Sequence, residues 1–280
     1  MKAIILNLSA WIILPFMDAI AKYLSTDLSF FQITWARYFF TVFWTLPFMF
    51  IFFRKKLTFS ENPKLQILRG LTLFSANICF FYSISIISMA KALTLAFVAP
   101  LVTTALSPIL LGEKVGIKRW TAVIVGFIGS LVVIRPGFIE FNLATVAALG
   151  TGCLYGFYLI ITRKLHSTDN PLLTLLLTGI VGATVSTFFV PIVWINPTNI
   201  QWLWLAIMGI FACLGHILLI YSLRYADASK LAPFGYFEII TNIILGYYVF
   251  KDFPDLWTFL GLLIIISSGI YIFRRELRNN

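Results

Sequence analysis

Charged residues are scarce in this 280-residue chain, at 11% of the sequence, whereas 60% of the residues are hydrophobic. A water-soluble domain is nearer half apolar and a quarter charged, and it would have no interior large enough for 28 phenylalanines. The composition therefore excludes an ordinary soluble fold and indicates that lipid surrounds most of the surface. Because lipid offers no hydrogen bonds, the backbone must form helices or a closed barrel. Long apolar runs favour helices.

The sequence also lacks the motifs of enzymes, metal proteins and ATP-driven pumps. It has no His-Glu-x-x-His motif and no Gly-x-x-x-x-Gly-Lys-[Ser/Thr] loop, so neither metal-dependent hydrolysis nor direct use of ATP is expected. Its 3 cysteines form no Cys-x-x-Cys pair and lie in apolar runs, where they are expected to be small buried hydrophobes. We therefore expect no catalytic residue, no metal site and no cofactor.

Apolar runs of about 20 residues, the length that crosses a bilayer, recur along the chain. They are separated by short connections rich in Pro, Asn, Asp and Lys, such as residues 60–63, 196–199 and 251–255, which are typical of turns. The runs predict an all-α integral membrane protein with ten transmembrane helices. They cover residues 3–24, 30–53, 65–87, 91–112, 117–135, 143–163, 170–194, 200–222, 229–250 and 256–273.

The chain contains an internal repeat. When residues 70–135 are shifted by 139 positions, polar landmarks coincide without a gap, and a shift of 142 aligns residues 22–27 with 164–169. The matched polar pairs include Gly70 with Gly209, Tyr82 with Tyr221, Lys91 with Lys230 and Glu113 with Asp252. Two similar halves in a hydrophobic chain are typical of transporters. The sequence predicts one five-helix module in residues 1–139 and a second in residues 140–280.

Lysine and arginine are distributed unevenly between alternate connections. If the N-terminus is cytoplasmic, most of them lie on the cytoplasmic side, which is the bias that orients inner-membrane proteins. The net charge of +10 is then a signal of topology, and no nucleic-acid partner is expected. Because each module has an odd number of spans, the second crosses the membrane in the opposite sense. We predict a multi-pass inner-membrane protein of two inverted repeats, with both termini in the cytoplasm.

A few ionisable side chains fall inside the apolar runs, where each costs about 2.5–3.5 kcal/mol on insertion scales. Glu238 lies about two turns into the ninth run, and no cation lies three or four residues away. We expect it to bind a cationic substrate group or a coupling proton; a hydrogen bond that locks helix packing is the alternative. Asp18 has the same expected role or pairs with Lys22 one turn later. Arg37 is expected to bind an anionic group, or else to extend to the outer surface.

Other polar residues in the apolar runs are candidates for lining the transport path. Asn77 and His216 are matched by the repeat and fall mid-run; interhelical hydrogen bonding is their alternative role. Tyr82 and Tyr221 are candidates for paired gates or for interfacial aromatics. Tyr236, two residues before Glu238, is also a candidate for substrate contact.

Two proline-containing runs are candidates for hinges. Pro100 interrupts the fourth run, and Pro233 with Gly235 lies near the start of the ninth, so each run is expected to line the cavity or simply to kink. Lys91 and Lys230 begin these runs, either as part of a gate or as anchors at the head groups. The fifth and tenth runs carry glycines and almost no polar residue. They are expected to pack against neighbouring helices or to form a homodimer.

The order of these features resembles the EamA-type branch of the drug/metabolite transporter superfamily. In that pattern each half has a cavity-lining helix, an acidic residue at a short turn and a glycine-containing last helix. The matching residues are Ala99-Pro100, Glu113 and Gly126 in the first half, and Ala232-Pro233, Asp252 and Gly261 in the second. The resemblance covers essentially the whole chain. It implies a secondary transporter that works by alternating access, with its site between the halves.

Several stretches are also similar to bacterial S-adenosylmethionine uptake transporters of that superfamily. They are residues 67–71, Asp18 with Lys22-Tyr23-Leu24, residues 35–40 and 231–233, Tyr236, Glu238 and residues 253–255. Gly235 departs from the pattern, because a basic or polar residue is expected there. The resemblance implies S-adenosylmethionine or an amino-acid-like compound as substrate, whose sulfonium and ammonium groups suit Glu238 and Asp18 and whose carboxylate suits Arg37.

The sequence also allows alternatives to this substrate and to transport itself. Within the superfamily, the alternative is export of amino acids or drugs. Outside transport, an intramembrane enzyme or a channel would need a reactive cluster or a selectivity filter, and neither is visible. The expected partners are the substrate, the bilayer and either a coupling proton or an exchanged metabolite.

Overall fold

A computed structural model of the chain describes residues 1–53, 60–134, 142–251 and 256–278; this part is helical and contains no strand. Five helical stretches in it are long and apolar enough to cross a membrane. Before residue 139 the helices are α1 (Lys2–Leu24), α2 (Phe30–Phe53), α3 (Pro63–Ile86), α4 (Met89–Ala96), α5 (Ala99–Leu111) and α6 (Ile117–Ile134). Later helices are α7 (Leu143–Lys164), α8 (Pro171–Thr187), α9 (Asn199–Tyr225), α10 (Ala228–Leu231), α11 (Glu238–Phe250) and α12 (Leu256–Arg278), with 3₁₀ segments η1 (Val190–Ile192) and η2 (Ala232–Phe237). The expected all-α architecture is confirmed for the described residues, whereas Asp252 and the rest of 252–255 lie outside them.

Local sequence explains where several helices begin. Pro63 and Pro171 occupy the first turns of α3 and α8, where a missing backbone N–H has no intrahelical partner to lose. At the start of α9, the Thr198 side chain accepts from the Gln201 amide, and the Gln201 side chain accepts from the Thr198 amide. This reciprocal capping satisfies two of the amides left over at a helix start.

The fourth apolar run is divided into two helices. α4 ends at Ala96, and α5 begins at Ala99 with Pro100 in its first turn. A proline is tolerated at this position but would disrupt a helix interior, because it lacks an amide and clashes with the preceding turn. The break therefore coincides with the proline. We call α4 and α5 together one broken helical path, because they follow each other within the same apolar run.

The ninth run is divided more extensively, which corrects one expectation. The sequence suggested that Glu238 lies about two turns inside a helix, but the structure places it at the first residue of α11, after the 3₁₀ segment η2. Pro233 and Gly235 both lie in η2, and these are the two residue types least compatible with an α-helix interior. Their presence explains the wide break that precedes Glu238.

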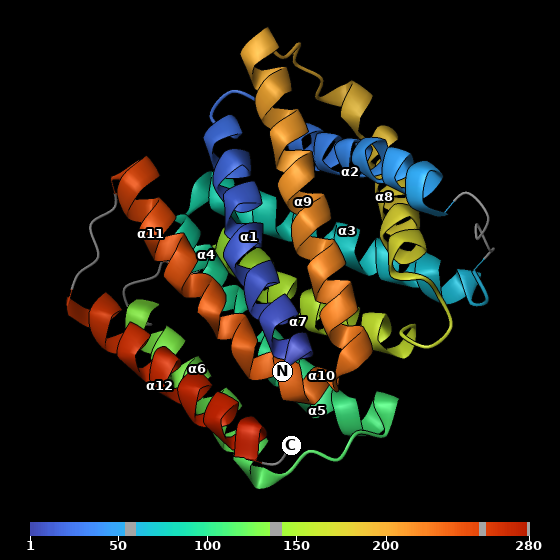
Figure 1. Cartoon of the computed structure of the whole chain (residues 1–280). Helices are drawn as coiled ribbons and strands as arrows, with labels where there is room; N and C mark the ends of the chain where they lie inside the picture. The colour runs from blue at the N-terminus through green and yellow to red at the C-terminus, as the bar shows by residue number, and fades with distance from the viewer. Residues whose placement is uncertain (54–59, 135–141, 252–255, 279–280) are drawn as a thin grey trace.

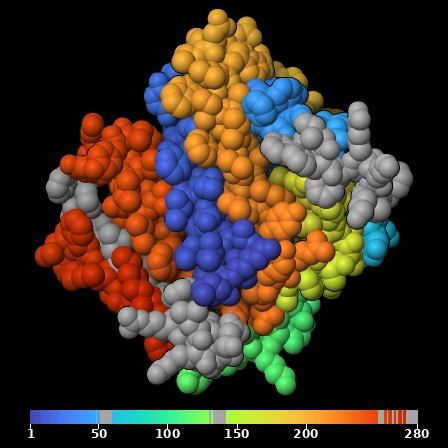
Figure 2. Space-filling view, in the orientation of Figure 1, coloured from blue at the N-terminus to red at the C-terminus, as the bar shows by residue number. Residues whose placement is uncertain are grey.

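Helix packing joins segments that are distant in the sequence. α1 packs along α9 and α3 packs along α7; Figure 2 shows α1 on the molecular surface between α9 and α11. α2 contacts α8 near one edge of the molecule, whereas α6 and α12 lie side by side at the opposite edge (Figure 1). The homodimer expected through these last two helices stays a prediction.

The matched glycines Gly70 and Gly209 occupy equivalent close contacts. A Cβ atom at Gly70 on α3 would clash with Val181 of α8, and a Cβ atom at Gly209 on α9 would clash with Phe40 of α2. Small residues let helix backbones approach each other closely, which is a common basis of packing in membranes. Both glycines are therefore required by the approach of a neighbouring helix.

Candidate functional site

A cavity is enclosed by residues from both halves of the chain. The non-atom space within it is about 890 Å³, open solvent included. Its walls come from α1, α3, α4, α5, α7, α9, α10, η2 and α11. Most lining residues are apolar, and none of the described lining residues is Lys or Arg. The cavity is therefore suited to an organic molecule and has no cationic side chain on its immediate wall.

Two carboxylates, Asp18 and Glu238, are the acidic residues of the described lining. Asp18 lies on α1 and is 5% exposed, and Glu238 begins α11 and is 9% exposed. Neither side chain forms a hydrogen bond or ion pair with another described residue. Lys22, the alternative partner of Asp18, donates from Nζ to the carbonyl oxygens of Ile84 at 3.0 Å and Ile87 at 3.4 Å. Because buried charges are normally paired, the two carboxylates are available to a cation or a proton.

Two buried arginines are joined by a chain of hydrogen bonds beside the cavity. Arg37 Nη2 lies 2.6 Å from His216 Nε2, His216 Nδ1 lies 3.1 Å from the Tyr158 hydroxyl, and Arg69 Nη2 donates to that hydroxyl at 2.6 Å. A guanidinium can only donate, so Nε2 must accept, and the neutral imidazole carries its proton on Nδ1. Both ring nitrogens of His216 are engaged. His216 therefore presents its ring to the cavity without a free nitrogen for a ligand.

Arg37 lies one side chain behind the cavity wall. It is 1% exposed, and its Nε contacts the Met17 sulfur at 3.1 Å. Met17 and His216 both line the cavity, whereas Arg37 does not. A direct contact between Arg37 and a ligand would require Met17 to move, which the flexible methionine side chain permits. An anionic group of a ligand can therefore contact Arg37 only after Met17 has moved aside.

An aromatic wall whose individual residues were not predicted from the sequence lies along the cavity. Trp11 donates from Nε1 to the Asn7 side-chain oxygen at 2.8 Å, and the Asn7 amide donates to the Ser222 hydroxyl at 3.2 Å. The Tyr155 ring lies 6.0 Å from the Trp11 ring, and both line the cavity. The signal was present in the sequence, because Asn7, Trp11 and Asp18 are separated by four and seven residues, which places them on one helix face.

The structure brings together about half of the residues singled out in the sequence. Those that line the cavity are Asp18, Asn77, Pro100, His216, Gly235 and Glu238. Those that do not are Arg37, Tyr82, Lys91, Tyr221, Lys230, Pro233 and Tyr236. A Cβ atom at Gly235 would lie at an ordinary 3.6 Å from both Pro100 and Trp11. The missing side chain therefore leaves part of the cavity open beside the aromatic wall.

The residues outside the cavity have identifiable surroundings. The Tyr236 hydroxyl donates to the carbonyl of Val123 at 3.0 Å, so this side chain joins η2 to α6. The Tyr82 ring packs against Phe30 with ring centres 5.5 Å apart. Lys91 is exposed at the start of α4. These three side chains are placed for helix packing or for the molecular surface.

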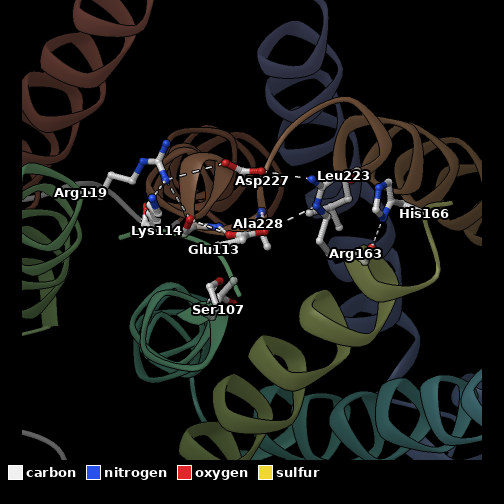
Figure 3. A network of polar contacts seen from close by, with 11 residues as sticks. Ser107, Glu113, Lys114, Arg119, Arg163, His166, Leu223, Asp227 and Ala228 are labelled. Atoms are coloured by element: carbon white, nitrogen blue, oxygen red, sulfur yellow. Dashed lines mark hydrogen bonds and ion pairs between the residues drawn. The ribbon is translucent and has the colours of Figure 1, made fainter. Parts of the chain in front are cut away.

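Polar residues form a cluster (Figure 3) beside Leu223 and Ala228, which line the cavity. Glu113, in the turn after α5, accepts from the Ala228 amide at 2.9 Å and from the Ser229 amide and hydroxyl at 3.0 and 2.7 Å. Arg163 lies 3.5 Å from Glu113 and donates to Asp227 at 3.1 Å. Arg119 also donates to the Ser229 hydroxyl at 3.1 Å. We call the five residues Glu113, Arg119, Arg163, Asp227 and Ser229 the Glu113 cluster.

Comparison with known proteins identifies the family. The sequence profile of the EamA-like transporter family matches residues 1–135 and again residues 142–274. The chain belongs to this family. It is thus a membrane transporter and not an enzyme, as its sequence predicts. A solved crystal structure shares the fold with a TM-score of 0.77, although the two sequences are only 18% identical; the match covers 95% of this chain and 96% of the other.

Curated relatives carry names that specify a cargo. The chain is 31% identical to the S-adenosylmethionine uptake transporter of Rickettsia bellii over 92% of its own length and 89% of the relative. Against the protein of the same name from Rickettsia prowazekii the identity is 30%, over 97% and 94% of the two chains. The riboflavin transporter of Vibrio cholerae is 29% identical, over 68% and 64%. The family transports small metabolites, and its members differ in which one.

Proposed function

We propose that this protein moves a cationic or zwitterionic organic metabolite across the inner membrane by alternating access, and that S-adenosylmethionine is the favoured substrate. The observation that carries the proposal is the pair of carboxylates, Asp18 and Glu238, in a cavity without a lysine or arginine among its described lining residues. A sulfonium and an ammonium group would neutralise them. A planar heteroaromatic group would pack on Trp11 and Tyr155.

Arg37 is proposed to serve the anionic end of the same substrate. Its guanidinium has five donors, and its side-chain hydrogen bonds in the structure go to the Met17 sulfur and to His216. A thioether is a weak acceptor, so a carboxylate that displaced Met17 would form the stronger contact. The relatives named S-adenosylmethionine uptake transporter support this choice of substrate.

We further propose ten membrane spans arranged as two inverted modules, residues 1–139 and 140–280, with both termini cytoplasmic. The separate profile matches to residues 1–135 and 142–274 support this division. Helix contacts support it as well, because exchanging the modules converts the α1–α9 pair into α7–α3 and the α2–α9 pair into α8–α3. The α2–α8 and α6–α12 pairs convert into themselves, as a two-fold relation between the modules requires.

Hydrogen bonds between the modules show the same exchange. Asp27, in the α1–α2 turn, accepts from the Gln201 side chain near the start of α9 at 3.0 Å. Asp169, in the matched α7–α8 turn, accepts from the Gln66 side chain near the start of α3 at 2.6 Å. In each case an acidic turn of one module reaches the long third helix of the other. This reciprocity supports two modules of opposite orientation.

Counterflow in proteoliposomes tests the proposed substrate. Vesicles preloaded with unlabelled S-adenosylmethionine should take up the labelled compound faster than empty vesicles, because a carrier exchanges substrate across the membrane. S-adenosylhomocysteine, which lacks the positive sulfonium, should compete on the order of tenfold more weakly, a ratio equivalent to about 1.4 kcal/mol. Absence of counterflow with S-adenosylmethionine would reject this substrate, and counterflow with riboflavin instead would assign the protein to the other named activity among its relatives.

A further inference from the structure

The Glu113 cluster forms hydrogen bonds with the backbone of residues that line the cavity. Ala228 lines the cavity and donates its amide hydrogen to Glu113 at 2.9 Å. Leu223 also lines the cavity, and its carbonyl oxygen accepts from Arg163 Nη1 at 2.8 Å. The cluster therefore holds in place the backbone of two residues that bound the cavity at the junction of α9 and α10.

The bonds of Glu113 join the two modules. Glu113 follows α5 in the first module, whereas its partners Arg163, Ala228 and Ser229 all belong to the second. Figure 3 shows the Glu113 carboxylate between the α9–α10 connection and the end of α7. If the modules separate at this end, these contacts must break together. They therefore oppose opening toward this side.

The chemistry of the cluster suits a contact that breaks and reforms. The Glu113 side chain is 6% exposed, and its two oxygens accept three hydrogen bonds from the α10 start. Bonds to a charged group are stronger than neutral ones, yet their net contribution stays modest because water replaces them when the partners separate. Once solvated, the carboxylate and the Arg163 guanidinium need no new protein partner.

We propose that the Glu113 cluster is the gate that closes this end of the cavity and must open once in each transport cycle. The proposal rests on alternating access as the mode of transport. It assigns Glu113 a role in conformational change and none in contact with the substrate. It also predicts that weakening the cluster exposes the cavity to one side of the membrane only.

Thiol labelling tests the gate without any substrate. The reporter is Leu223→Cys in a protein whose native Cys79, Cys153 and Cys213 are replaced by alanine, and the probe is a membrane-impermeant maleimide. The rate is measured in right-side-out and inside-out vesicles. Glu113→Gln and the milder Ser229→Ala should each accelerate labelling from one side only, on the order of tenfold, as expected for the loss of one charge-assisted hydrogen bond.

Asp169→Asn is the matched control. Asp169 is also buried, joins the two modules and accepts from the Ser60 hydroxyl, the Glu61 amide and the Gln66 side chain. None of these partners lines the cavity, so labelling should stay at the parent rate. The gate is rejected if neither Glu113→Gln nor Ser229→Ala accelerates labelling, or if Asp169→Asn accelerates it equally.

A cross-link separates failure of the gate from failure of the proposed substrate. Cysteines introduced by Glu113→Cys and Ser229→Cys are joined by a short bifunctional thiol reagent that a reductant can cleave. Counterflow should stop on cross-linking and return after reduction. Undiminished counterflow in the fully cross-linked protein would overturn the gate while leaving the transport activity intact. If the uncross-linked parent shows no counterflow of S-adenosylmethionine, the substrate assignment fails and the labelling experiment still decides the gate.

Discussion

The two broken helical paths that line the cavity, α4–α5 and α10–η2–α11, share their plan but differ in chemistry. Both end in a residue with left-handed backbone, Gly112 after α5 and Lys251 after α11, and these positions are 139 residues apart, as in the repeat. At the same offset, Glu238 corresponds to Ala99; each begins an α-helix after the break, and each lines the cavity. The two paths therefore share their backbone arrangement, but only one of them carries a charged residue, Glu238, at this position. The asymmetry of the site thus comes from a few side chains.

Removing the charge from Glu238 should give the largest effect. Glu238→Gln keeps the size of the side chain but loses its attraction for a cation, and losing a buried charge contact typically costs about 2–5 kcal/mol. We expect uptake of S-adenosylmethionine, measured as kcat/KM in proteoliposomes, to fall on the order of 100-fold. Asp169→Asn, which removes an equally buried acid outside the cavity, is the control. Uptake that persists at the parent level in Glu238→Gln would remove this residue from the site.

Moving the acid to the equivalent position should restore part of the loss. In a Glu238→Ala background, Ala99→Glu places a carboxylate at the start of α5, on the other path into the same cavity. We expect recovery of about tenfold in kcat/KM, less than the full activity because the distance to Asp18 and to the aromatic wall changes. Ala99→Gln in the same background controls for size. Equal recovery by both variants would show that the charge does not matter at this position.

The apolar runs were sufficient to predict an all-α architecture, but not the division of the ninth run into α10, η2 and α11. They could not show which face of a helix meets the cavity. In lipid both the outer face and the packed face are apolar, so a span carries little of the polar periodicity that orients a helix in a soluble protein. For this reason Tyr236 was expected to contact substrate, although the structure directs it to Val123.

The partners of the buried arginines were also beyond prediction from local sequence. Arg69 is 89 residues from Tyr158, and Arg37 is 179 residues from His216. Spacing rules identify neighbours on one helix, whereas these contacts depend on how helices of the two modules cross. Asp18 and Glu238 could be predicted individually, because a carboxylate in an apolar run is visible in any single sequence.

The hydroxyl in the arginine network should affect stability more than the hydroxyl of the half-buried Tyr82 does. Tyr158→Phe removes the hydroxyl that accepts from Arg69 and contacts His216. We expect a loss of about 1–3 kcal/mol in the free energy of unfolding, because it leaves buried donors unsatisfied. Tyr82→Phe makes the same chemical change on a half-buried side chain and should stay within about 0.5 kcal/mol of the parent. Thermal unfolding in detergent measures both; equal shifts would show that the Tyr158 hydrogen bonds add nothing to stability.

The smallest expected effect concerns the two matched helix ends. Lys251 has a φ of 61° and Gly112 a φ of 67°, a backbone conformation that costs a side-chain-bearing residue roughly 1–2 kcal/mol. Lys251→Gly should relieve this strain, but it also raises the conformational entropy of the unfolded chain, so we expect a net gain below about 1 kcal/mol. Gly112→Ala should destabilise the protein by about 1 kcal/mol, with open space around its Cβ excluding a steric clash. Opposite signs in thermal unfolding would establish that both modules use the same helix ending, and a loss of stability in both variants would separate them.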